Sequence, residues 1–381
     1  MIAARARRRG RGHRAHPDEG RRRQPRAGAV LATDWYAEKL GAPIVGVDVQ
    51  LGRQLPRWLV AAAESLGPLR GLLIARVARG FERVALVQGS PGTITFAVCE
   101  RLRPGPPRLV LLEMIDRPRP RRPLRRLAYR GWFALIVRPA LTGAVRRAHV
   151  LSLRERERYA RRYGLEYERL AYVPWALVRE VPARLPEVEG GEGVFASGRA
   201  NCDWETVFAA ARAGGWDLTV ACGEADLERV EGLNRDGFAR VLCEVPRSRH
   251  DQILFGTAVY VISVREAAAS TGQVRLMSAV GAGVPVVASA VDALVDYIDD
   301  GNTGLTVPPE DPVLLRSAVD GLLADPARRR ELREAALEVA RDWTYADFYA
   351  AILDLIADRE PRVPASLGGG EAQRDERDRS D

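Results

Sequence analysis

The feature that most constrains the fold of this chain is an alternation of short apolar runs with stretches of helical periodicity. In the first half, Arg83–Val87 and Arg108–Leu112 fit buried strands, and Thr93–Arg101 between them fits a helix. The same alternation continues from Gly193–Ala196 to Gly304–Val307. Strands that alternate with helices predict βαβ units and parallel sheets. A chain of 381 residues is long enough for two such domains.

The formal net charge of +8 belongs to the first residues of the chain. Residues 1–27 contain ten arginines against Asp18 and Glu19, which accounts for +8, so the remainder is close to neutral. This stretch has almost no apolar residues, and we expect a disordered tail. An arm for nucleic acid or an anionic membrane is the alternative. Because Lys39 is the only lysine, we attribute the arginines to compositional bias. No recognisable nucleic-acid-binding module accompanies the basic segments of the chain, so we expect no nucleic-acid partner.

Cysteine and histidine usage argues against a disulfide framework and against a metal site. Cys99, Cys202, Cys222 and Cys243 are far apart and form no Cys-x-x-Cys motif, so we expect small buried side chains in a reducing compartment. The histidines are scattered without metal-ligand spacing, and no metal or other cofactor is expected. No apolar run reaches the roughly 20 residues of a membrane-spanning helix. These features predict a cytoplasmic protein.

The stretch from Ser270 to Ser289 says most about function. A helix is predicted over Thr271–Ala282, preceded by small polar residues and followed by a buried strand over Val284–Ser289. The first turn of a helix has free N–H groups and the positive end of the helix dipole, which together favour anions. If the anion is a diphosphate, the protein binds a nucleotide-activated substrate.

Three sequence blocks in this region occur in a characteristic order and spacing. Gly283-x-Pro-Val-Val-Ala-Ser289 is followed by Asp296-Tyr-Ile-x-Asp-Gly-x-Thr-Gly-Leu305 and by Val307-Pro-Pro-x-Asp-Pro312. They resemble the nucleotide-sugar-binding half of GT-B glycosyltransferases, family four in particular, and the resemblance runs from about residue 193 to 357. It implies an α/β GT-B fold, in which two Rossmann-like domains with parallel sheets face a central cleft.

The resemblance and the composition together predict the domain boundaries. They are a disordered tail at 1–27, an acceptor-side domain at 28–181, a linker at 182–192, a nucleotide-sugar-binding domain at 193–343, a helix at 344–360 that crosses back to the first domain, and a disordered tail at 361–381.

The resemblance also implies an activity. A retaining hexosyltransferase would move a sugar from a nucleoside-diphosphate sugar to an acceptor hydroxyl without a metal. The acceptor would be a saccharide or a lipid-linked molecule, in the synthesis of cell-surface polysaccharide or glycolipid. Such an enzyme would be cytoplasmic or peripheral on the inner face of the cytoplasmic membrane.

The first group of candidate site residues would bind the donor diphosphate. By resemblance, Gly198 and Arg199 face it after the strand at Gly193–Ala196, and a guanidinium offsets the charge of the leaving group. The family usually has a lysine a few residues further on, and this chain has none there. We expect Arg265 to replace it. A surface arginine beside a turn is the alternative for Arg199.

The second group opens the helix at Thr271–Ala282. The family usually has two glutamates eight positions apart, and this chain has Ser270 and Ser278 there. Serine forms hydrogen bonds but carries no charge. We expect Ser270, Thr271 and Gly272 to contact phosphate, Gln273 to bind a sugar hydroxyl and Ser278 to bind ribose. Helix capping by Ser270 is compatible with this role.

The remaining candidates are two residues for the base and three carboxylates. The resemblance places the nucleotide base at Val245 and Pro246. Glu266 is a candidate for the carboxylate that Ser270 lacks. Glu113 and Asp116 end a predicted strand, where ligands bind in open α/β sheets, and would position or deprotonate the acceptor hydroxyl. A solvated or paired carboxylate is the alternative for all three.

Arg117–Arg147 is a basic segment with apolar and aromatic residues. It contains ten arginines and no acidic residue. We expect a helix over Pro123–Arg147 and a strand over His149–Ser152. A basic amphipathic helix fits an anionic membrane surface, and a core helix with an arginine-rich outer face fits the same pattern.

Two other functions remain open at this point. The missing glutamates and lysine favour a non-catalytic GT-B homologue that binds a nucleotide sugar or a partner enzyme. A sugar-nucleotide epimerase is the other, and it requires a carboxylate pair near the sugar.

Overall fold

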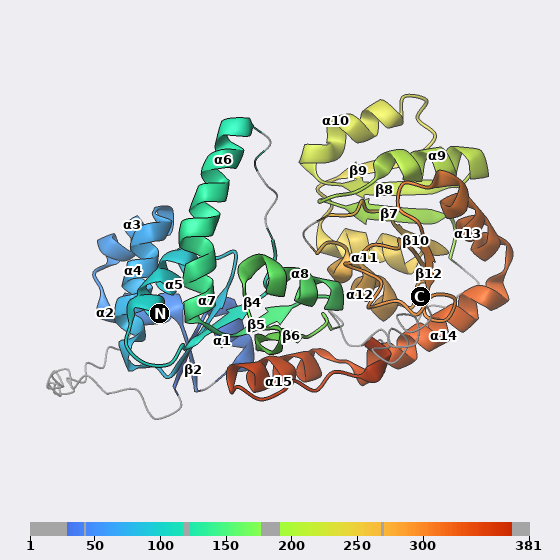
Figure 1. Cartoon of the computed structure of the whole chain (residues 1–381). Coiled ribbons are helices and arrows are strands. Elements are labelled where there is room, and N and C mark those ends of the chain that lie inside the picture. Colours follow the sequence, from blue (N-terminus) through green and yellow to red (C-terminus); the bar gives the residue numbers. More distant parts are fainter. Residues whose placement is uncertain are drawn as a thin grey trace, which may run out of the picture.

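The computed structural model describes residues 29–41, 43–116, 120, 122–176, 191–267 and 270–367. The predicted tail at 1–27, the linker residues 182–190 and the end of the chain from 368 lie outside the described residues. The described residues form two domains, each built on one parallel sheet covered by helices (Figure 1). The α/β class and the two parallel sheets expected from the sequence are confirmed.

The N-terminal sheet has the strand order β2-β1-β3-β4-β5-β6. Its strands are β1 (Val30–Ala32), β2 (Ile44–Gly46), β3 (Arg83–Val87), β4 (Leu109–Leu112), β5 (Val145–Val150) and β6 (Leu170–Tyr172). Its helices are α1 (Asp34–Leu40), α2 (Val47–Gln54), α3 (Arg57–Ser65), α4 (Gly67–Val77), α5 (Thr93–Leu102), α6 (Pro123–Trp132), α7 (Arg138–Ala144) and α8 (Leu153–Tyr163).

The C-terminal sheet has the order β12-β11-β10-β7-β8-β9. Its strands are β7 (Val194–Gly198), β8 (Leu218–Cys222), β9 (Arg240–Cys243), β10 (Val259–Ile262), β11 (Val286–Ser289) and β12 (Leu305–Val307). The helices of this half are α9 (Trp204–Gly214), α10 (Glu224–Leu233), α11 (Arg247–Phe255), α12 (Gln273–Ala282), α13 (Pro312–Ala324), α14 (Pro326–Asp342) and α15 (Tyr345–Ile356).

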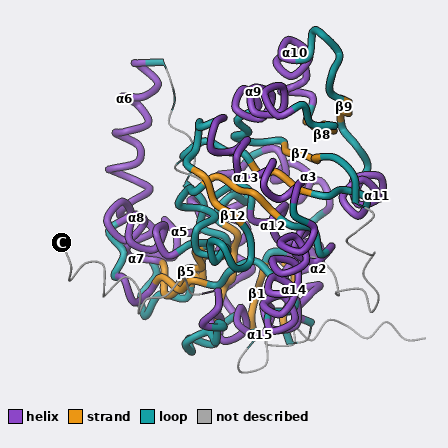
Figure 2. Tube along the Cα trace, turned by 90° about the vertical axis from the view of Figure 1, so that its right-hand side faces the viewer, coloured by secondary structure: helices purple, strands orange, loops and turns teal. Residues whose placement is uncertain are grey.

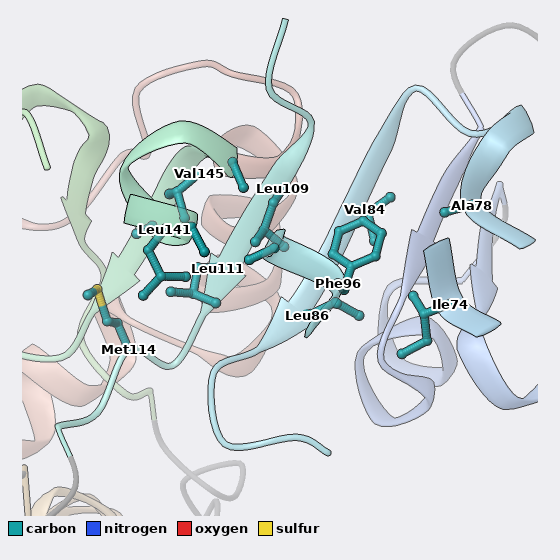
Figure 3. Close-up of a cluster of buried hydrophobic side chains, with 14 of the residues drawn as sticks. Ile74, Ala78, Val84, Leu86, Phe96, Leu109, Leu111, Met114, Leu141 and Val145 are labelled. Atoms are coloured by element: carbon teal, nitrogen blue, oxygen red, sulfur yellow. The ribbon is translucent and has the colours of Figure 1, made fainter. Parts of the chain in front are cut away.

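The inner strands are short and apolar because helices cover both faces of each sheet. All four residues of β4 are buried. Figure 3 shows Leu109 and Leu111 of β4 beside Leu141 of α7, with Phe96 of α5 next to β3. Glycine allows the close helix contact nearby, since a Cβ on Gly71 of α4 would lie 2.5 Å from Gly92 O.

The basic segment differs from the sequence expectation. One helix was expected over Pro123–Arg147, but α6 continues through a π-helical turn, Phe133–Val137, into α7, which ends at Ala144. The next residues belong to β5, and Arg147 within it pairs with Glu360 at 2.7 Å. Arg146 in the same strand is ion-paired with Asp358. Carboxylates that follow α15 therefore neutralise two arginines, a contact that the local sequence does not reveal.

Helix α15 runs back from the second domain to the first (Figures 1 and 2). Its buried face, which includes Phe348 and Ile352, packs against strand residues of the N-terminal sheet such as Val110. The Trp343 indole N–H, just before α15, donates to Pro174 O at 3.0 Å. Helix α15 therefore covers part of the first sheet.

The loops at the carboxyl ends of the two sheets contact each other. Asp296, after β11, accepts a hydrogen bond from the backbone N–H of Leu153 at the start of α8, at 2.7 Å. The Tyr297 hydroxyl donates to Leu151 O at 2.9 Å and accepts from the Trp175 N–H at 3.0 Å. These contacts turn the ligand-binding edges of the two sheets toward one another.

Candidate functional site

The strand order of the C-terminal sheet brings Gly198 and the start of α12 together. The strand order reverses between β7 and β10, which are parallel neighbours: β8 and β9 follow β7 on one side, and β11 and β12 follow β10 on the other. Ligands of open α/β sheets bind at the carboxyl ends of the strands at such a switch point. Gly198 ends β7 there, and the segment after β10 leads through Arg265 to Gly272, directly before α12.

Arg275, in the first turn of α12, reaches across this point. Its guanidinium donates to Ser197 O and lies against the Cys202 thiol. It also fills the space beside Gly198, so that a side chain at Gly198 would collide with it. The guanidinium therefore lies between the end of β7 and the start of α12, where a diphosphate would meet both.

Arg199 directly follows β7 and is exposed. Its side chain is 67% exposed and pairs with Glu244 Oε2 at 2.8 Å. Glu244 Oε1 accepts a hydrogen bond from the backbone N–H of Glu224, the first residue of α10, at 3.1 Å. An exposed ion pair of this kind is weak. Glu244 therefore holds the Arg199 guanidinium only weakly.

Arg265 is held by carboxylates. Its guanidinium contacts Asp203 Oδ1 and Glu205 Oε2, each at 2.7 Å, and Glu310 Oε1 at 3.3 Å. The guanidinium groups of Arg229 and Arg265 lower the pKa of Glu205 to about 2. Because these carboxylates already compensate its charge, Arg265 is a poorer candidate for the missing cation than Arg275.

Gly272 and Gln273 shape the start of α12. Gly272 is the N-cap and has φ +101°, in the left-handed region that favours glycine. The Gln273 side chain is buried and donates from Nε2 to Ala293 O at 3.0 Å. The predicted contact of Gln273 with a sugar hydroxyl would therefore depend on its carbonyl oxygen. Thr271 precedes this turn and is half-buried.

Ser270 faces the N-terminal domain. Burial raises the pKa of Glu155 on α8, and the hydroxyls of Tyr159 and Ser270 partly offset that rise. Ser270 Oγ and Glu155 Oε2 are both buried, and neither has a hydrogen bond of normal geometry among the described residues. The Glu155 carboxylate of the N-terminal domain therefore lies close to Ser270, which was predicted to contact phosphate.

The other predicted donor residues lie on α12, between β9 and α11, and after β10. Ser278 Oγ donates to Val274 O within α12, at 2.7 Å. Val245 is half-buried and packs against the core of the second domain, and Pro246 is the exposed N-cap of α11. Glu266 is exposed and accepts from the backbone N–H of Asp292 at 3.2 Å. These positions remain predictions.

Of the two acceptor-side carboxylates, Glu113 is the more available. It follows β4 with φ +47°, a strained conformation for a non-glycine residue. Its Oε1 accepts a hydrogen bond from the Tyr36 hydroxyl at 2.9 Å. Burial raises the pKa of Glu113. A raised pKa makes this carboxylate a stronger proton acceptor near neutral pH.

Asp116 is bound on several sides. It is buried, pairs with Arg162 Nε at 3.0 Å and accepts from the Tyr163 hydroxyl at 3.1 Å. Its backbone N–H donates to the Tyr159 hydroxyl at 2.9 Å. A structural role fits these contacts better than acceptor chemistry. Arg117, the next residue in the chain, lies outside the described residues.

Sequence reasoning missed Arg275 and Tyr36. The sequence does contain a signal for Arg275, because an arginine in the first turn after Ser-Thr-Gly lies at the helix end that is predicted to bind an anion. No local pattern identifies Tyr36, which lies 77 positions before Glu113. In the described part of the chain, no group of three or more His, Cys, Asp or Glu side chains is arranged to hold a metal ion.

Comparisons with known proteins identify a family region in the second domain. Residues 204–325 match the family model described as glycosyl transferases group 1. One relative is D-inositol 3-phosphate glycosyltransferase of Corynebacterium diphtheriae, 35% identical over 101 residues, which are 26% of this chain and 23% of that protein. The chain thus spans less than a third of the length of the curated relatives that it matches.

The solved structures that resemble this one do so over most of the chain. Anabaena HepE in complex with UDP and glucose has a TM-score of 0.61 at 10% identity, over 87% of this chain and 99% of that one. Sucrose-phosphate synthase of Thermosynechococcus elongatus has a TM-score of 0.60 at 16% identity, over 87% and 98%. The fold is therefore that of GT-B glycosyltransferases, and its second domain contains the glycosyl transferases group 1 region.

Proposed function

We propose that this protein is a glycosyltransferase that moves a sugar from a nucleoside-diphosphate sugar to an acceptor hydroxyl. The observation that carries the proposal is the meeting of Gly198, Arg275 and the start of α12 at the switch point of the second sheet. A guanidinium and free helix N–H groups are the donors that a leaving diphosphate needs. Several glycosyltransferase relatives and a UDP-bound structural neighbour support this choice.

In the proposed mechanism the two domains have separate tasks. Arg275, Arg199 and the α12 start stabilise the charge that develops on the diphosphate as the sugar leaves. Glu113, on the opposing domain, accepts the proton of the acceptor hydroxyl or orients it. We propose a retaining transfer without a metal, in which closure of the domains excludes water.

The acceptor is proposed to be a saccharide or lipid-linked molecule at the cytoplasmic face of a membrane, in polysaccharide or glycolipid synthesis. No described helix is long and apolar enough to span a bilayer. Helix α6 supports a peripheral contact, because it projects from the domain and has no buried residue (Figures 1 and 2). Leu124, Leu127 and Leu135 are 83%, 67% and 79% exposed, beside several arginines.

A panel of nucleoside-diphosphate sugars tests the donor proposal. A specific donor is expected to raise the melting temperature of the wild type by mass action. Arg275→Ala should lose most of this shift, and Arg199→Ala a smaller part, because Arg199 is exposed. Arg316→Ala is the matched control, since Arg316 pairs with Asp320 on α13. A full shift in Arg275→Ala would remove this residue from the site.

Turnover separates the enzyme from a non-catalytic nucleotide-sugar-binding homologue. The absence of a carboxylate at Ser270 favours that second candidate. Purified wild type is expected to transfer or slowly hydrolyse the donor that it binds. Glu113→Gln should keep the thermal shift but lose turnover. Donor binding without any turnover in the wild type would favour the non-catalytic homologue.

A further inference from the structure

Two cysteines that are distant in sequence are direct neighbours in the second sheet. The last rung between the parallel strands β8 and β9 pairs Cys222 with Cys243. Adjacent strands lie about 4.7–4.9 Å apart, and paired residues point to the same face of the sheet. This spacing lies within the Cα separation of about 4.4–6.8 Å that a disulfide spans. Both thiols are free in the structure.

The two sulfurs differ in access. Cys222 is 3% exposed and lies on an inner strand, whereas Cys243 is exposed on the edge strand β9. Burial raises the pKa of Cys222 to about 11, and the neighbouring Cys243 thiol adds to this rise. An oxidant from solvent would therefore react first at Cys243, with Cys222 beside it to complete a disulfide.

We propose that Cys222 and Cys243 form a reversible disulfide and are a redox modification site of this protein. With a disulfide oxidant such as oxidised glutathione, the Cys243 thiolate attacks one oxidant sulfur and releases the first thiolate. The Cys222 thiolate then attacks the Cys243 sulfur and releases the second. Two electrons pass to the oxidant, and the two cysteine protons end on the released thiols or in solvent.

The site adjoins the predicted donor pocket. Cys243 directly precedes Glu244, which has φ +47° and joins Arg199 to the start of α10. A disulfide needs Cβ atoms about 3.5–4.5 Å apart, closer than the spacing of two strands. Closing it pulls the end of β9 toward β8 and displaces this turn. We infer that oxidation weakens donor binding, and this consequence rests on the proposed function.

Thiol mapping tests the disulfide itself. The wild type and the control Cys99→Ser, incubated with oxidised glutathione, should each lose the mass of two hydrogen atoms and yield a linked Cys222–Cys243 peptide. Cys222→Ser should instead retain glutathione on Cys243. At pH values below the pKa of Cys222, the rate of disulfide closure should increase about tenfold for each unit by which the pH is raised. A wild type that keeps glutathione on Cys243 while Cys222 stays free overturns the proposal.

Nucleotide binding tests the consequence separately. Reduced and oxidised wild type are titrated with UDP and GDP, with oxidant-treated Cys243→Ser as the control. The nucleotide that binds the reduced protein should bind the oxidised protein several-fold more weakly, and reduction should restore the affinity. Equal affinities overturn the coupling. If the reduced protein binds neither nucleotide, the proposed function fails, whereas the thiol mapping still decides the modification site.

Discussion

At the scale of single residues, His149 shows how burial decides a protonation state. It is fully buried on β5, and its Nε2 lies 2.8 Å from Val173 O. The backbone N–H of Glu113 donates to its Nδ1 at 3.3 Å. Nε2 must therefore carry the proton of a neutral ring and donate it to Val173 O. Burial lowers the pKa of His149 to about 4.

This buried histidine predicts a loss of stability in mild acid. The unfolded chain binds a proton at His149 below pH 6.5, whereas the folded protein does so only below about pH 4. The free energy of unfolding should fall as the pH drops through this window, by up to roughly 3 kcal/mol from this residue. Urea denaturation across the window measures it. The variant His149→Gln should show a shallower dependence, and an equal slope would contradict the assignment.

At the same scale, the contacts of Arg265 and Arg275 distinguish the two arginines as candidates for the second cation. The position of Arg265 after a strand of the second half is visible in the sequence, but its three carboxylate partners come from separate segments. Arg275 has fewer competing acids among its contacts in the described chain, and its backbone partner, Ser197 O, lies at the switch point. The distinction depends on which side chains meet after folding.

At the scale of elements, α6 is the part of the basic segment that fits a membrane. It begins at Pro123 with proline in its first turn, and the π-helical turn carries its direction into α7. Arg146 and Arg147 belong to β5 and are paired with acids, so they are withdrawn from any such surface. The leucines of α6 and of the following turn remain exposed.

Vesicle pelleting tests this surface. The double variant Leu124→Ser with Leu135→Ser should bind anionic vesicles more weakly than the wild type, because both side chains would insert at the interface. Its melting temperature should stay close to that of the wild type, since both residues are exposed. Leu102→Ser, at a position 78% exposed on α5, is the matched control. Equal pelleting of wild type and double variant would contradict the membrane proposal.

At the scale of the whole molecule, Tyr297 couples the two domains. Its buried hydroxyl bridges Leu151 O and the Trp175 N–H, two backbone groups of the N-terminal half. Tyr297→Phe leaves both without this partner, which should cost about 1–3 kcal/mol. Calorimetry should show a lower melting temperature and a separation of the unfolding of the two domains.

The control for this prediction is a weaker contact at the same interface. Asp292→Asn removes an ion pair with Arg158 Nη1 at 3.3 Å, in which both side chains are about one third exposed. Partly exposed pairs contribute within about 1 kcal/mol, so the transition should barely move. If Tyr297→Phe behaves like Asp292→Asn, the hydroxyl bridge does not hold the domains together.

The sequence by itself determined the α/β class and the parallel sheets, and it predicted the region where a donor would bind. These follow from local signals, since the alternation of apolar runs fixes strands and helices, and Ser-Thr-Gly before a helix marks an anion site. Only the tertiary structure decided which guanidinium lies beside Gly198, that Tyr36 binds Glu113, and that Cys222 adjoins Cys243. Each of these depends on strand order and on contacts between distant segments, which no local periodicity encodes.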